Sequence, residues 1–98
     1  LLVTLGARGA IAMTRSGGIY WAKPPTIERV SSVGSGDAFV AGFAAGSMQR
    51  LGMAQRLQLA VACGAANAES FGAGKVDAER VKQLVGQVRV ERLGGGEQ

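Results

Sequence analysis

The sequence contains no histidine and only one cysteine, Cys63. Without histidine the chain cannot form a Ser-His-Asp or Cys-His nucleophilic site, or a histidine-based metal site. One cysteine cannot form an internal disulfide framework, so we interpret Cys63 as a small core residue and expect a reducing, cytoplasmic compartment. No apolar run approaches the roughly 18–20 residues of a membrane span, and the first residues lack a signal-peptide pattern. We therefore expect no membrane partner.

Aromatic residues are few as well, at 5% of the 98 residues, whereas glycine occurs 16 times. Apolar residues make up 47% of the sequence and charged residues 18%, which is the balance of a chain that forms a core. The net charge is +4, and the 11 basic residues are spread along the chain rather than gathered in a block. This scatter predicts no nucleic-acid partner, so a basic nucleic-acid-binding domain is the weakest of three interpretations.

Short apolar runs separated by turn residues predict strands in the first part of the chain, at residues 1–5, 10–14 and 19–22. Turns would connect them at residues 6–9 and 15–18. Pro24 and Pro25 end the third strand because they cannot donate ladder hydrogen bonds. A further short strand is expected at residues 27–30. Trp21, on the third strand, is interpreted as a packing residue.

Helical patterns follow. The first helix would run from Ala38 to a C-terminal glycine at Gly52, with Gly42 and Gly46 on one face where another element can approach closely. A second helix is predicted at residues 54–70. A third would begin after an N-cap at Asp77, with its apolar stripe formed by Val81, Leu84, Val85 and Val88. Residues 93–98 would be a frayed tail, and the helices would cover a parallel sheet in the complete protein.

The feature that points most directly to chemistry is the loop Val33-Gly34-Ser35-Gly36-Asp37 before the first helix. A helix N-terminus presents unpaired N–H groups and a partial positive charge, and the glycines leave these groups unobstructed. Gly34, Ser35 and Gly36 therefore predict an anion hole for a phosphoryl group. Asp37 would lie beside it, where a carboxylate can take the proton of an acceptor hydroxyl. On spacing alone, the alternative that Asp37 is only the N-cap stays open.

A second glycine turn, Thr4-Leu5-Gly6-Ala7-Arg8-Gly9, directly follows the first predicted strand. Such a turn can expose its backbone to a nucleotide, but an ordinary hairpin turn has the same pattern. Two other nucleotide motifs are absent. The segment Gly72–Val76 lacks the first glycine of a P-loop and the hydroxyl residue after its lysine, and no GxGxxG run occurs.

The motifs also have a characteristic order. TLGARG follows a strand, VGSGDAFVAGFAAG opens a helix, and a small-residue helix with GAANA precedes a GAG loop. Over about residues 1–88 this order resembles the PfkB, or ribokinase-like, family of carbohydrate kinases. It is most similar to the branch that contains 1-phosphofructokinase and tagatose-6-phosphate kinase. Ser31 and Ser32 stand where the family pattern has Asp and Thr, and Ser35 stands where it has Ala.

The resemblance implies roles for individual residues. Asp37 would be the catalytic base, and Gly34, Ser35 and Gly36 the anion hole for the γ-phosphate. The nucleotide site would be lined by Thr4, Gly6, Gly9, Val61, Ala65 and Asn67. For the last three, plain helix packing is the open alternative. A monovalent cation would lie near Ser31, Val33, Asn67, Ser70 and Gly72, although Ser31 replaces the acidic residue that cation-binding members often carry.

The resemblance also implies a fold and a reaction. The fold is α/β, the C-terminal portion of a ribokinase-like three-layer arrangement, with residues 1–98 as one partial domain. The reaction is ATP-dependent phosphoryl transfer to a hydroxyl of a sugar or sugar phosphate, with Mg²⁺ held mostly by residues outside this chain. A homodimer is a further expectation for the complete protein. Since the sugar-binding half and an N-x-x-E magnesium motif have no match, we expect the isolated residues to be inactive. The alternative is a non-catalytic nucleotide-binding or assembly fragment.

Overall fold

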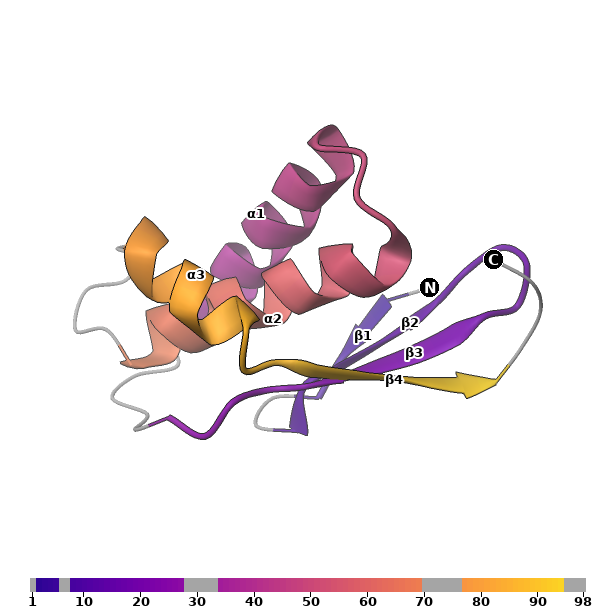
Figure 1. The fold of residues 1–98 in the computed structure, drawn as a ribbon, viewed down its shortest axis with the longest axis horizontal. Helices are drawn as coiled ribbons and strands as arrows, with labels where there is room; N and C mark the ends of the chain where they lie inside the picture. Colours follow the sequence, from indigo (N-terminus) through magenta and orange to yellow (C-terminus); the bar gives the residue numbers. More distant parts are fainter. Residues whose placement is uncertain (1, 6–7, 28–33, 70–76, 95–98) are drawn as a thin grey trace.

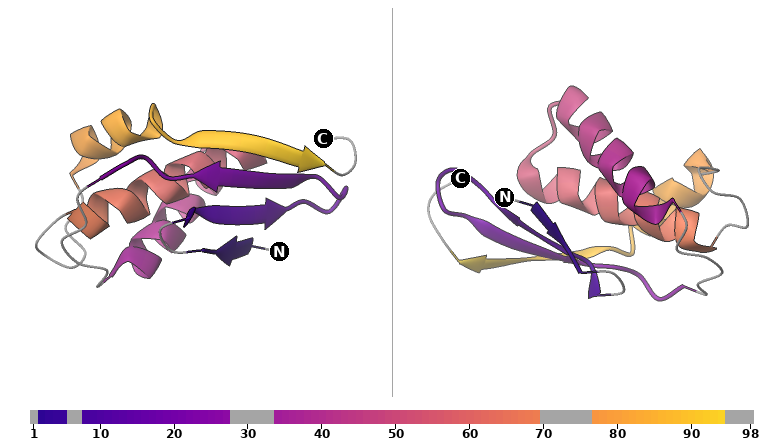
Figure 2. Two further views of the ribbon diagram at one scale, coloured as in Figure 1. Left: turned by 90° about the horizontal axis from the view of Figure 1, so that it is seen from below. Right: turned by 180° about the vertical axis from the view of Figure 1, so that it is seen from behind.

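The short apolar runs near the N-terminus do form strands. The computed structural model describes residues 2–5, 8–27, 34–69 and 77–94. Its strands are β1 (Leu2–Thr4), β2 (Ala10–Met13), β3 (Ile19–Lys23) and β4 (Arg89–Gly94), and its helices are α1 (Ser35–Met48), α2 (Met53–Glu69) and α3 (Ala78–Val85). The strands form one sheet in the order β1-β2-β3-β4, and the helices lie on one side of it (Figures 1 and 2).

Alternation along β2 and β3 decides which side of the sheet faces the helices. Ala10, Ala12, Tyr20 and Ala22 are buried, whereas the residues between them are more exposed. The hairpin predicted at residues 15–18 is confirmed, since the N–H of Thr14 donates to the carbonyl of Gly18 at 2.8 Å. The predicted end of the third strand is confirmed too, because β3 stops at Lys23, before the two prolines.

Every pair among the described strands is antiparallel, and the parallel sheet expected of the complete protein stays a prediction. In addition, β4 was not predicted, and it continues through Leu93 and Gly94, where a frayed tail was expected. Its pairing partner, β3, lies far away in the sequence, and local patterns do not reveal such partners. Ile27 lies in no strand, and residues 28–30 of that predicted strand are outside the described part.

Helix α2 forms the middle layer between the sheet and α1. Its buried face includes Leu57 and Ala60, which join the same core cluster as the buried residues of β2 and β3. The predicted close approach at Gly42 and Gly46 is confirmed. A Cβ on Gly42 would lie 3.0 Å from the Cα of Ala60, and one on Gly46 would lie 3.2 Å from the Cα of Arg56. The two helices therefore run antiparallel, and the start of α1 lies beside the second half of α2 (Figure 1).

The end of α1 corrects the prediction of a C-terminal glycine at Gly52. The helix ends at Met48, and Arg50 takes the left-handed conformation with φ 59°. The N–H of Leu51 donates to the carbonyl of Gly46, and that of Arg50 to Ser47, each at 3.0 Å. These two bonds form a Schellman motif, in which the left-handed residue is usually glycine. Here the left-handed residue is Arg50, two positions before Gly52.

Asp77 is the N-cap of α3, as predicted, and its carboxylate accepts from the N–H of Glu79 at 3.0 Å. Asp77→Ala removes this acceptor, so we expect the complete protein to lose about 1 kcal/mol of unfolding free energy. Denaturant unfolding measures the change. Asp77→Asn keeps an acceptor oxygen and is the matched control. Equal stability of the alanine and asparagine variants would contradict the capping role.

An ion pair joins the end of α2 to α3. The guanidinium of Arg80 donates to both carboxylate oxygens of Glu69, one of them at 3.0 Å, and this hydrogen bonding lowers the pKa of Glu69. In the unfolded chain the pKa of a glutamate is about 4.3, and in the folded protein the pKa of Glu69 is lower. The ion pair therefore stabilises the fold at pH values above about 4.3. This contribution is lost as the pH falls through the folded-state pKa. Glu69→Gln should therefore lower the unfolding midpoint at pH 7, and the difference from wild type should shrink on acidification. A difference that is constant from pH 7 to pH 3 would contradict this.

Candidate active site

The first turn of α1 carries the residues predicted for phosphoryl transfer. The N-cap is Gly34, with a left-handed φ of 80°, and no side chain caps the turn. The N–H of Ala38 donates to the carbonyl of Gly34 at 2.9 Å and closes the turn. The N–H groups of Ser35, Gly36 and Asp37 precede this bond, so they are the ones that a helix leaves for an external acceptor.

Asp37 is the third residue of α1, so the alternative that it is the N-cap is wrong. Its side chain is exposed, and a Cβ on Gly36 would meet no atom within 4 Å. A carboxylate in the first turn is favoured by the helix dipole. The turn thus combines the backbone donors of a helix start, open space beside Gly36 and one accessible carboxylate.

The turn between β1 and β2 closes through its backbone, because the N–H of Leu5 donates to the carbonyl of Gly9 at 2.7 Å. Gly9 is buried and has a φ of 97°, and an added Cβ would lie 1.9 Å from the carbonyl oxygen of Ala22. Only glycine fits there. Thr4 is exposed at the end of β1, whereas Gly6 lies outside the described residues.

The three α2 residues predicted for the nucleotide site are all buried. Val61 and Ala65 belong to the core cluster with residues of β2 and β3, and Asn67 is only 1% exposed. Their burial favours helix packing, the alternative left open by the sequence, and a nucleotide contact for them stays a prediction. Of the five positions predicted for a cation, only Asn67 lies in the described residues.

The start of α1 and the second half of α2, which carry predicted positions far apart in the sequence, lie toward the same end of the molecule (Figure 2). Among the described residues no group of three carboxylate or cysteine side chains is placed to hold a metal.

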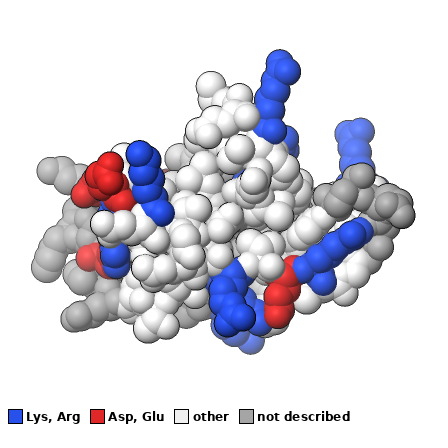
Figure 3. Space-filling model, viewed as in Figure 1, with Lys and Arg blue, Asp and Glu red and all other residues white. Residues whose placement is uncertain are grey.

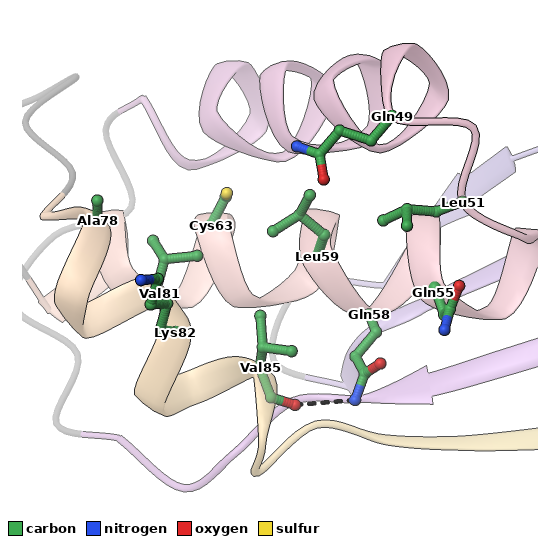
Figure 4. A pocket seen from close by; sticks show the side chains of 10 residues that line it. All are labelled: Gln49, Leu51, Gln55, Gln58, Leu59, Cys63, Ala78, Val81, Lys82 and Val85. Carbon is green, nitrogen blue, oxygen red and sulfur yellow. Dashed lines mark hydrogen bonds between the residues drawn. The ribbon is translucent and has the colours of Figure 1, made fainter.

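A groove of about 620 Å³ lies elsewhere, between α2, α3 and the C-terminal end of α1 (Figure 4). Its lining is largely apolar and includes Leu59, Cys63, Val81 and Val85, and none of the predicted site residues contributes to it. Partial burial raises the pKa of the Cys63 thiol, which disfavours the reactive thiolate. The groove therefore does not coincide with the candidate active site.

The charged side chains agree with the scatter seen in the sequence. On the face shown in Figure 3, basic and acidic groups are dispersed over the described surface without a continuous basic patch. No helix in the described ranges has both the length and the hydropathy to cross a bilayer.

Comparison with known proteins decides the family. The model of the pfkB family carbohydrate kinases matches residues 1–80. The chain belongs to this family. It is 34% identical over 93 residues to a 1-phosphofructokinase of Vibrio cholerae and 38% identical over 93 residues to one of Bacillus subtilis. It is also 32% identical over 90 residues to a tagatose-6-phosphate kinase of Staphylococcus epidermidis.

Solved structures place this pfkB family chain in the ribokinase-like fold class, as predicted. A Staphylococcus aureus structure assigned as a phosphofructokinase superposes with a TM-score of 0.89 at 34% identity, covering 98% of this chain and 30% of that one. Phosphofructokinase-2 of Escherichia coli, in complex with potassium, gives a TM-score of 0.81 at 21% identity over 87% of this chain and 27% of its own. The two 1-phosphofructokinases and the tagatose-6-phosphate kinase match 92–95% of this chain, and the chain spans only 29–30% of their length.

Proposed function

We propose that the complete protein transfers the γ-phosphoryl group of ATP to a hydroxyl of a sugar phosphate, and that this chain supplies the catalytic base and the anion hole. One observation carries the proposal. In a chain of the pfkB family, an exposed Asp37 stands in the first turn of a helix whose N-cap, Gly34, has no side chain. This arrangement places a proton acceptor beside backbone donors that suit a phosphoryl group.

In the proposed mechanism Asp37 accepts the proton of the attacking hydroxyl. The backbone N–H groups around Gly34, Ser35 and Gly36 bind the charge that develops on the transferring group, and they are already oriented by the helix. The nucleotide site would be lined by Thr4, Gly6, Gly9, Val61, Ala65 and Asn67. Mg²⁺ would neutralise phosphate charge, but the described residues offer no ligand cluster for it, so no step is assigned to a metal held by this chain.

The substrate class is inferred from the relatives. Those named 1-phosphofructokinase and tagatose-6-phosphate kinase are named for phosphorylated ketohexoses. We infer that the acceptor is a ketohexose monophosphate.

The test uses the protein expressed from its complete reading frame. Fructose 1-phosphate, tagatose 6-phosphate and fructose 6-phosphate are each incubated with MgATP, and ADP release is followed by a coupled assay. Transfer to one of the three supports the proposal. Binding of ATP without transfer to any sugar phosphate or free ketohexose would overturn it in favour of the non-catalytic nucleotide-binding alternative.

A further inference from the structure

Trp21 makes a contact that its sequence pattern does not predict. Its indole Nε1–H donates to the backbone carbonyl of Arg8 at 2.9 Å. Arg8 lies in the turn between β1 and β2, and its own N–H donates to the carbonyl of Leu5 at 3.2 Å. The indole therefore hydrogen-bonds to the same turn that is proposed to line the nucleotide.

The Trp21 ring also has a charged neighbour, Lys23, on the same strand. The Nζ of Lys23 lies 4.7 Å from the ring centroid, which is a cation–π distance. The same Nζ forms an ion pair with Glu91 of β4 at 3.1 Å. Since Trp21 and Glu91 are paired in register, β4 helps to fix the ring. These contacts limit the rotamers from which the indole can reach the turn.

Strand β3 contacts the turn at the next residue as well. The position of a Cβ on Gly9 lies 1.9 Å from the carbonyl oxygen of Ala22 and 3.0 Å from Cδ of Pro24, so the backbone of Gly9 packs directly on β3. The carbonyl of Arg8 accepts a hydrogen bond from a side chain of β3, and Gly9 packs against the backbone of β3. A glycine turn has much conformational freedom to lose, so two adjacent contacts reduce the entropy lost on binding a ligand.

We infer that Trp21 is a positioning residue for the nucleotide site, acting through the carbonyl of Arg8 rather than by touching the nucleotide. The inference rests on the proposed function, because it takes the turn to line ATP. It explains why an indole, which buries only part of its surface here, stands at this point of the outer sheet face. A side chain with only a packing role would not need its N–H directed at the turn.

The test compares wild type with Trp21→Phe in the complete protein. Phenylalanine keeps a ring beneath Lys23 but has no N–H. Losing one hydrogen bond that orders the turn should raise KM for MgATP roughly three- to tenfold. The kcat and the KM for the sugar phosphate should stay within about twofold, because the groups at the reacting atoms are unchanged. Ile19→Val, on the same strand and face but away from the turn, is the matched control and should leave all three constants unchanged.

A second measurement does not depend on the variant folding. In wild-type protein, the Trp21 indole N–H resonance should shift when MgATP is added and not when the sugar phosphate is added alone. An unmoved resonance, or an unchanged KM for MgATP in a folded Trp21→Phe variant, would overturn this inference and leave the kinase proposal intact. Absence of both ATP binding and turnover in wild type would overturn both.

Discussion

Replacing Asp37 with Asn in the complete protein is expected to lower kcat by about 10²–10⁴-fold, which is the range of a general acid–base contribution. Asparagine is nearly the same size and keeps an oxygen in the first turn of α1, but it cannot accept the proton of an attacking hydroxyl. The Kd for MgATP should stay within about threefold, because the backbone donors of the turn remain in place. Steady-state kinetics and a direct nucleotide titration measure the two effects separately.

A suitable control for Asp37→Asn is Glu79→Gln. Glu79 is also an exposed carboxylate in the first turn of a helix, and its weak ion pair with Lys82, at 3.9 Å, lies on α3. Both substitutions remove a negative charge that the helix dipole stabilises, so both should change the free energy of unfolding by similar small amounts. Only Asp37→Asn should abolish most turnover. Retained turnover in that variant, or an equal loss in Glu79→Gln, would show that the carboxylate of Asp37 is not the base.

The sequence is most informative where local chemistry sets the structure. Short apolar runs and turn residues predicted β2 and β3, the hairpin between them and the end of β3 before Pro24. The capping carboxylate of Asp77 and the glycine spacing on α1 were also predictable, because each depends on neighbours within one or two turns of helix.

Features that depend on distant partners were not predictable in this way. The sequence pattern places Val88 in the apolar stripe of α3, yet the helix ends at Val85, and the chain pairs with β3 from Arg89 onward. Gln58 of α2 stabilises this exit, since its side-chain amide donates to the carbonyl of Val85 at 2.9 Å (Figure 4). The end of α1 at Met48 was also not predicted, although its hydrogen bonds are local: Arg50, and not Gly52, takes the left-handed conformation.

The candidate site also contains features that the sequence could predict and features that it could not. The sequence pattern placed Gly34, Ser35 and Gly36 in a loop before the helix, whereas α1 begins at Ser35 with Gly34 as its N-cap. The contribution of Trp21 was missed, because its register opposite Ile11 and its reach to Arg8 follow only from strand pairing. Conversely, a spacing of one helical turn on α2 could not show that Val61 and Ala65 would be core residues.

Gly9→Ala is expected to have the largest effect on stability, and its cause is local. At a φ of 97° an alanine is strained, and its Cβ would lie 1.9 Å from the carbonyl oxygen of Ala22. Because that atom belongs to the backbone of β3, a rotamer change cannot relieve the clash. Adding a backbone cost of about 1–2 kcal/mol to an overpacking cost of about 1–3 kcal/mol predicts a loss of about 2–5 kcal/mol.

Denaturant unfolding of the complete protein measures this loss, and Gly86→Ala is the matched control. Gly86 has a right-handed φ of −66°, and a Cβ there would meet only the carbonyl of Gln83 at an ordinary 3.6 Å. That substitution should leave stability unchanged or raise it by up to about 1 kcal/mol, since alanine restricts the unfolded chain. Equal effects of the two substitutions would show that β1, β2 and β3 can separate enough to admit a methyl group. The turn would then be too loosely held by β3 to position a nucleotide.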